Sequence, residues 1–346
     1  MSGLTTVWGE TLNPDAVLQE YPRPQLVRGS YLNLNGWWDY AITGSDEIPV
    51  RYDGKILVPF SPEAPLSGVN RTLLPGQVLW YRRTLNVTAQ PGKRLLLHIG
   101  AADQRTRVYL NGMLLGEHVG GYTAFTVELT RALAEENTLC IAVRDDTDKS
   151  PLSRGKQKTK RGGIWYTPQS GIWQTIWLEW VPETYISGLK ITPDAEKGSV
   201  RITVQSAQSR ACYVLFQGRR TGGYTNREMN LTVSEPELWS PEHPKLYDFA
   251  VELGDDHVES YFALRSVAVE KDAQGTMRLK LNGRPYFHTG VLDQGYWPDG
   301  LYTAPSDEAL IYDIQLMKDM GFNMLRKHIK IEPMRWYYHC DRLGML

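Results

Sequence analysis

Residues 281–346 read LNGRPYFHTGVLDQGYWPDGLYTAPSDEALIYDIQLMKDMGFNMLRKHIKIEPMRWYYHCDRLGML, and their pattern decides the fold. The β-favouring residues 286–292 predict a strand. Residues 306–320 predict a helix, because apolar side chains recur at helical spacing between a potential N-cap, Ser306, and a stop, Gly321. Residues 322–328 predict a second strand, and residues 333–344 a second helix. This order is typical of a (β/α)8 barrel, which needs about 250 residues, so we expect only the first βα units of a truncated barrel.

The region before these units is predicted to be almost entirely β. Short β-rich segments separated by turns fill residues 80–181, which favours a β-sandwich of jelly-roll type. Asn111-Gly112 is the strongest hairpin signal among them. Residues 184–269 give strands at the spacing of an immunoglobulin-like β-sandwich. The predicted fold is mostly β: a jelly roll in 1–183, an immunoglobulin-like sandwich in 184–270 and the start of a barrel in 271–346.

Composition excludes several classes of partner. The 346 residues include 38 basic and 39 acidic side chains, so no global field attracts nucleic acid or an anionic membrane. The basic run 154–161 lacks interleaved aromatics, and we interpret it as a solvated loop. Neither a signal peptide nor a membrane-length apolar run is found. Three widely spaced cysteines without CxxC spacing favour thiols in a reducing compartment, so we predict a cytoplasmic protein.

Several motifs, in order along the chain, carry a resemblance to a known family. They are Val108–Gly112, Gly120–Tyr122, Ser170–Gln174, Leu238–Pro244, Leu281–Pro285, Phe322–Arg326, Trp336-Tyr337, Cys340-Asp341 and Gly344. Together they resemble the amino-terminal part of glycoside hydrolase family 2. The resemblance implies a sugar-binding jelly roll, an immunoglobulin-like domain and the start of a TIM barrel. It also implies a retaining exo-β-glycosidase for terminal β-linked sugars, β-galactosidase-like first and β-glucuronidase-like second, with an oligosaccharide or β-glycoside as substrate.

Glycoside hydrolysis usually requires two carboxylates, about 5 Å apart in retaining enzymes. The resemblance implies that both are glutamates beyond the third barrel strand, after the residues of this chain. We therefore assign no catalytic residue here and expect the fragment to be inactive. Glu308 and Glu332 are interpreted as charges at helix starts.

One wall of the sugar pocket is what these residues are expected to supply, because barrel sites form at the carboxyl ends of the strands. Asp and Gln can hydrogen-bond sugar hydroxyls, Trp can stack on a pyranose, and Arg or Lys can hold hydroxyls or carboxylates. Arg326 matches the family arginine, whereas Ile329–Ile331 replace the family's His-Tyr-Pro, and the loop 291–298 replaces a histidine-rich one. Asp293 has the alternative of a capped loop residue, and His328 that of a strand-end histidine. The predicted pocket residues are Asp293, Gln294, Tyr296, Trp297, Arg326, His328 and Lys330.

A second hypothesis comes from a different functional class. A jelly roll with a Trp-rich platform in residues 165–180 would suit a non-catalytic carbohydrate-binding or assembly module. No cofactor or metal is expected, because Gly163 and Trp165 stand where some family members place an acidic ligand. We expect association, such as a homo-oligomer, through apolar faces around Leu316, Met317 and Met324.

Overall fold

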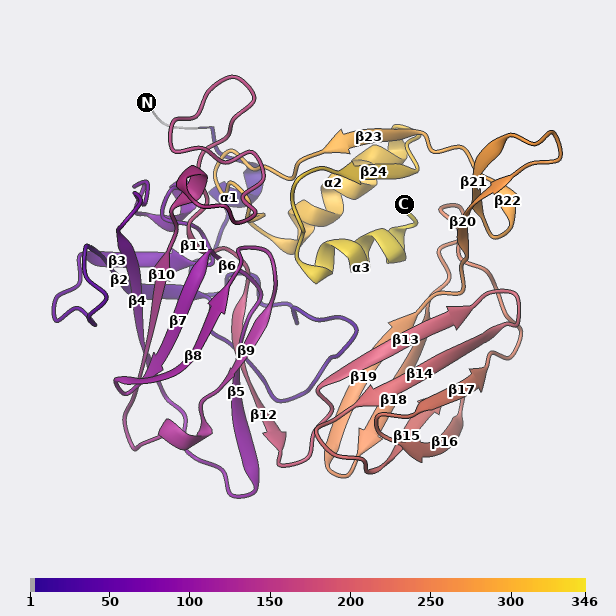
Figure 1. Cartoon of the computed structure of the whole chain (residues 1–346), viewed down its shortest axis with the longest axis horizontal. Coiled ribbons are helices and arrows are strands. Elements are labelled where there is room, and N and C mark those ends of the chain that lie inside the picture. Colours follow the sequence, from indigo (N-terminus) through magenta and orange to yellow (C-terminus); the bar gives the residue numbers. More distant parts are fainter. Residues whose placement is uncertain (1–3) are drawn as a thin grey trace.

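A computed structural model describes residues 4–346 (Figure 1). Its first β-sandwich has two main sheets, in the orders β1-β12-β5-β9 and β3-β2-β4-β10-β7-β8. A short antiparallel pair, β6 and β11, completes it. The strands are β1 (Tyr31–Asn33), β2 (Gly36–Thr43), β3 (Gly54–Val58), β4 (Val78–Leu85), β5 (Lys93–Ile99), β6 (Ala102–Asp103), β7 (Arg105–Leu110), β8 (Met113–Val119), β9 (Phe125–Glu128), β10 (Asn137–Arg144), β11 (Gly171–Ile172) and β12 (Ile176–Pro182).

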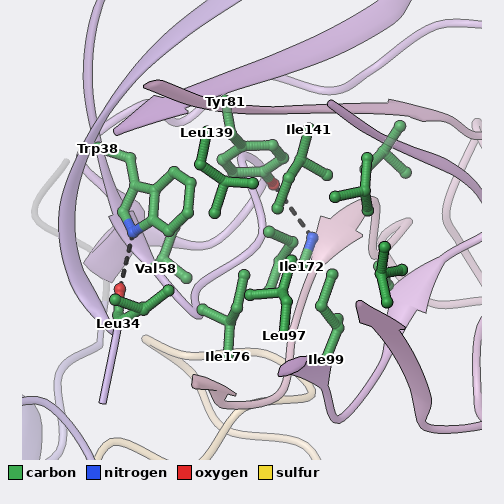
Figure 2. Close-up of a cluster of buried hydrophobic side chains, with 14 of the residues drawn as sticks. Leu34, Trp38, Val58, Tyr81, Leu97, Ile99, Leu139, Ile141, Ile172 and Ile176 are labelled. Carbon is green, nitrogen blue, oxygen red and sulfur yellow. Dashed lines mark hydrogen bonds between the residues drawn. The ribbon is translucent and has the colours of Figure 1, made fainter. Parts of the chain in front are cut away.

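The two main sheets bury a common core of aliphatic and aromatic side chains. Figure 2 shows how two of its polar groups are paired: Trp38 Nε1 donates to the Leu34 carbonyl at 2.8 Å, and the Tyr81 hydroxyl accepts from Ile172 N at 3.1 Å. This pairing stabilises the core because an unpaired buried polar atom is costly. The predicted hairpin is also confirmed, since both residues of the 111–112 turn have positive φ between the paired strands β7 and β8.

The second β-sandwich packs sheets ordered β13-β14-β17 and β16-β15-β18-β19 around a separate core. Arg28 joins it to the first sandwich, because its guanidinium lies 3.0 Å from Glu179 and 2.8 Å from Asp256. The sequence prediction missed β16, a largely exposed strand rich in Arg and Gly. The strands are β13 (Gly188–Asp194), β14 (Ser199–Gln205), β15 (Ala211–Phe216), β16 (Arg219–Tyr224), β17 (Glu228–Thr232), β18 (Tyr247–Leu253) and β19 (Asp256–Phe262).

A three-stranded sheet follows, built from β20 (Val267–Lys271), β21 (Met277–Leu281) and β22 (Arg284–Pro285). After it come two parallel strands, β23 (Gly290–Asp293) and β24 (Met324–Lys327). The prediction of a strand over 286–292 is therefore wrong in its first half. Pairing with β24 starts only at Gly290, and Phe287 before it is 84% exposed.

Both predicted helices are present, as α2 (Asp307–Asp319) and α3 (Met334–Leu343). The Ser306 hydroxyl caps α2 by accepting from Ala309 N, Glu308 lies in its first turn as predicted, and Gly344 ends α3 with a φ of 78°. Figure 1 shows β23, β24, α2 and α3 gathered together, and they share a small core. The prediction of a mostly β fold is confirmed. Within residues 4–346 the barrel-like part has one pair of parallel strands, so a barrel stays a prediction.

The remaining helical segments are short. They are α1 (Val7–Glu10) and the 3-10 turns η1 (Pro65–Ser67), η2 (Thr130–Ala132) and η3 (Thr147–Lys149). Across residues 4–346, every helix falls short of the length and apolar character needed to cross a bilayer.

Candidate sugar-binding wall

The carboxyl ends of β23 and β24 place two kinds of side chain on opposite faces. Leu292 pairs with Arg326 and Asp293 with Lys327, and neighbouring residues of a strand alternate between faces. Lys327 points to the helices, because its Nζ lies 4.0 Å from the ring centre of Trp336 in α3. Arg326 lies on the other face, where it is exposed. The structure thus separates Arg326 from Asp293, although the sequence predicted one common wall.

Lys327 is the centre of a charge network on the helix side. Its Nζ lies 2.5 Å from Asp293 Oδ2 and 2.8 Å from Glu332 Oε1. Lys330 Nζ lies 3.0 Å from the same Glu332 oxygen. Glu332 precedes the N-cap Pro333 and is only 5% exposed, so its interpretation as a helix-start charge is wrong. It neutralises two largely buried lysines instead.

The pKa values of the two lysines shift in opposite directions. Burial disfavours the charged form of both amines and so works to lower both pKa values. For Lys327 the neighbouring carboxylates of Glu332 and Asp293 outweigh burial and raise its pKa. For Lys330, burial outweighs the attraction of Glu332, and its pKa is lowered.

Lys330 is held by backbone carbonyls as well as by Glu332. Its Nζ donates to Gly295 O at 2.6 Å and to Tyr302 O at 2.7 Å. An ammonium has three N–H donors, so these contacts leave Lys330 without one for a sugar. Asp293 is similarly engaged, because besides its ion pair it accepts from Gly295 N at 2.8 Å.

Asp313 in α2 is a further acidic group near this network. Burial, followed by the charge of Asp293, raises the pKa of Asp313 to about 6. Sequence reasoning missed Asp313 and Lys327 as members of the site. The signal that could have found Lys327 is the parallel register, which sets it beside Asp293.

The predicted aromatic residues lie in packed clusters. Tyr296 contacts the rings of Tyr166 and Tyr302, at centroid distances of 4.4 and 4.7 Å. Trp297 is 7% exposed and packs edge-on against Trp8. A pyranose needs an open ring face for stacking, and neighbouring protein groups occupy the Trp297 indole in this structure.

Three of the predicted residues have side-chain groups at the strand ends that no other group among residues 4–346 occupies. Gln294 Oε1 is buried and has no hydrogen-bond partner there. His328 lies beside this residue, because the His328 backbone N–H donates to Asp293 O at 2.8 Å. Arg326 completes the set on the exposed face.

The basic loop 154–161 contributes to this region from the first sandwich. Gln157 is fully buried, and its Nε2 donates to Asp103 Oδ2 at 3.2 Å. Its Oε1 accepts from Gln169 N, while the Gln169 side chain accepts from Tyr302 N at 3.0 Å. The loop is therefore packed around Gln157, and its interpretation as simply solvated is wrong at this residue.

The predicted Trp-rich platform is not formed by Trp173, which is 1% exposed. Its Nε1 donates to Gly121 O, and its ring packs against Tyr302 at a centroid distance of 5.4 Å. Trp177 is also buried and stacks on His98. These indoles stabilise the interior rather than present a flat surface.

Acidic, histidine and cysteine side chains do not gather into a metal site in the described part of the chain, where no group of three suitable ligands is present. The three cysteines are free thiols.

Comparison with known proteins identifies the family. The family model of glycosyl hydrolases family 2 matches residues 184–265. A β-galactosidase of Bacteroides ovatus is 26% identical over 332 residues, covering 85% of this chain and 36% of that protein. A putative β-glucuronidase of Formosa agariphila is 26% identical, over 77% of this chain and 34% of that protein. The chain thus spans about a third of the length of these curated relatives.

Solved structures agree in fold. A β-glucuronidase of Faecalibacterium prausnitzii matches 94% of this chain and 60% of its own length, with a TM-score of 0.75 and 22% identity. A β-glucuronidase of Ruminococcus gnavus gives a TM-score of 0.76 at 18% identity, covering 95% of this chain and 58% of that protein. The matched family model, together with relatives that extend over the rest of the sequence, shows that this chain belongs to the glycosyl hydrolases of family 2.

Proposed function

We propose that this chain is part of a retaining exo-β-glycosidase that removes terminal β-linked sugars, with a β-galactoside as the first candidate. The observation that carries the proposal is the parallel pair β23–β24, whose carboxyl ends bring Gln294 and His328 together in a family 2 chain. Active sites of barrel enzymes form at this end of the strands. Gln294 has a free acceptor for a sugar hydroxyl, and the exposed Arg326 guanidinium supplies donors.

The buried charge network supports this wall rather than reacting with substrate. A retaining glycosidase needs one carboxyl as acid and one as nucleophile. Asp293 and Glu332 both pair with Lys327, and a carboxylate held by an ammonium is a poor proton donor. We therefore propose that residues 1–346 alone do not turn over a glycoside.

A β-glucuronidase is the second candidate. Arg326 is an exposed guanidinium at the end of β24, and guanidinium groups bind carboxylates in a bidentate manner. A uronic acid would use this cation more fully than a neutral hexose. The non-catalytic binding module is a third candidate, which predicts sugar binding that does not depend on Arg326.

Calorimetry of the purified chain tests these candidates. Methyl β-galactoside and methyl β-glucuronide are titrated into the wild type, Arg326→Ala and a control, Arg284→Ala, which alters another exposed arginine, on β22. Loss of binding with Arg326→Ala alone supports the pocket wall, and the preferred sugar selects the enzyme. Binding that is equal in all three proteins supports the module. Hydrolysis of a chromogenic β-galactoside or β-glucuronide by the chain would contradict the proposed inactivity.

Location and assembly are also part of the proposal. Free thiols are typical of a reducing compartment, which supports a cytoplasmic location. Leu316 and Met320 are exposed on α2 and favour association through this helix, whereas Met317 packs against the small core. Analytical ultracentrifugation of the wild type and Leu316→Glu measures the contribution of this face.

A further inference from the structure

A cavity of about 290 Å³ lies where three parts of the chain meet. The segment before β1 contributes Glu20 and Arg23. The first sandwich contributes Trp173 and Trp177, and the start of α3 contributes Met334. Because separate parts of the chain build its walls, the cavity exists only in the folded protein.

The two indoles offer apolar ring surface to this cavity. Trp173 Nε1 donates to Gly121 O at 2.7 Å, and Trp177 Nε1 donates to Glu179 Oε1 at 2.8 Å. Their N–H groups are therefore used by the protein. Leu18 adds aliphatic surface, so the greater part of any ligand here must be apolar.

Two polar atoms of wall residues lack partners among residues 4–346. Glu20 Oε2 and Arg23 Nε are both buried and make no hydrogen bond there. Such atoms are costly to leave unpaired. Arg23 is held in place by its ion pair with Glu179, at 2.7 Å, so its Nε–H is a fixed donor.

These two atoms define the polar part of a ligand. A carboxylate oxygen accepts a hydrogen bond and a guanidinium N–H donates one. A hydroxyl is a small neutral group that can both donate and accept, whereas an ion would add an unbalanced charge to a mainly apolar cavity. The ligand therefore needs at least one hydroxyl.

The volume sets the size of the ligand. An engineered apolar cavity of about 150 Å³ holds one benzene ring. The present cavity of about 290 Å³ has room for two fused rings. We propose that this cavity binds a small, flat, apolar molecule of about two rings that carries a hydroxyl, with 2-naphthol as a suitable probe. This binding does not depend on the glycosidase proposal.

The test uses the full 346-residue chain with 2-naphthol and naphthalene as probes, measured by calorimetry. Ala124→Trp and Met334→Trp each fill the cavity from a different wall, at positions that are exposed and tolerant of a larger side chain. Ala207→Trp, at an exposed bend of the second sandwich, is the matched control.

We expect saturable binding of 2-naphthol by the wild type and Ala207→Trp, and binding weaker by about 10-fold or more in both filled variants. Glu20→Leu should weaken 2-naphthol about fivefold and leave naphthalene unchanged, because only the partner of the hydroxyl is lost. Circular dichroism establishes that each variant is folded. Absence of saturable binding by the folded wild type, or equal binding by the filled variants and the control, overturns the site. Equal effects of Glu20→Leu on both probes overturn the role of the hydroxyl.

Discussion

Lys327 Nζ lies 2.8 Å from Glu332 Oε1, so the last residue of β24 is bound to a carboxylate in the segment that leads into α3. The same ammonium reaches Asp293 at the end of β23. One lysine therefore fixes two strand ends and the following loop relative to each other. A buried ion pair is not by itself a source of net stability, but removal of one partner leaves the other charge unpaired.

Lys327→Met should destabilise the chain by about 3–5 kcal/mol, because Glu332 would lose an ammonium while remaining buried. The control is Lys190→Met, which changes an exposed lysine in β13 and should alter stability by about 0.5 kcal/mol or less. Urea unfolding, followed by tryptophan fluorescence, measures both. Equal midpoints for the two variants would show that the network contributes little.

Gly295 lies within this charge network and tests its packing. A Cβ at this position would clash with Glu332 Oε1 and lie 2.8 Å from Lys330 Nζ, and its φ is +61°. Gly254 has a φ of +57° with no atom within 4 Å of such a Cβ. Both Gly→Ala changes impose about 1–2 kcal/mol of left-handed strain.

Gly295→Ala should therefore cost about 1–3 kcal/mol more than Gly254→Ala, because only Gly295 adds a steric conflict. Thermal unfolding of the two variants measures the difference. A similar loss in both would mean that the lysines and Glu332 move aside freely.

The sequence predicted those elements whose signals are local. The β5 and β14 bounds agree with the predicted segments, because alternation and turns mark both ends. Helix α2 was also predicted closely, since Ser306 and Gly321 lie at its ends. Residues 286–289 carry β-favouring side chains but find no partner in the parallel pair, so their propensity is overridden by register.

The site was harder to predict because its contacts are long-range. The prediction placed Asp293 and Arg326 on one wall from their positions at strand ends. Pairing then directs Asp293 towards Lys327 and leaves Arg326 on the opposite face. Burial of Trp297 by Trp8 depends on a residue almost the whole chain away, which no local pattern reports.

Asp307 at the start of α2 gives a second test of a buried charge. Its carboxylate accepts two hydrogen bonds from Arg335, at 2.5 and 2.6 Å, and lies 3.0 Å from His339 Nε2. Asp307→Asn should cost about 3 kcal/mol, because the bidentate pair is lost inside the protein.

The neighbouring Glu308→Gln is the matched control for Asp307→Asn. It lies in the same first turn, so it experiences the same helix dipole, but it is exposed. A change of about 0.3–1 kcal/mol is expected. Comparable losses for the two variants, measured by urea unfolding, would assign the effect to the dipole rather than to Arg335.

A carboxyl pair in the first sandwich predicts the pH dependence. Ser170 Oγ lies 2.9 Å from both Glu63 Oε1 and Asp145 Oδ2. A hydroxyl has one proton and can donate to only one of them, so a proton on one carboxyl completes the second bond. Burial raises the pKa of Glu63 to about 7 and that of Asp145 to about 6. Burial, followed by the charge of Asp145, also raises the pKa of the neighbouring Asp103, which acts in the same direction.

The pKa values of Glu63 and Asp145 both lie above those of an unfolded chain, which are about 4. The folded state therefore holds protons that the unfolded state releases, so the stabilisation is complete below about pH 4 and is lost as the pH rises through about 6 and 7. We expect each carboxyl to contribute a loss on the order of 1–3 kcal/mol across that range. Glu63→Gln, which supplies a permanent neutral donor, should flatten this part of the stability profile. Unfolding measured at intervals across the range, in the wild type and Glu63→Gln, tests the assignment. An identical slope in both proteins would show that Glu63 does not carry the proton.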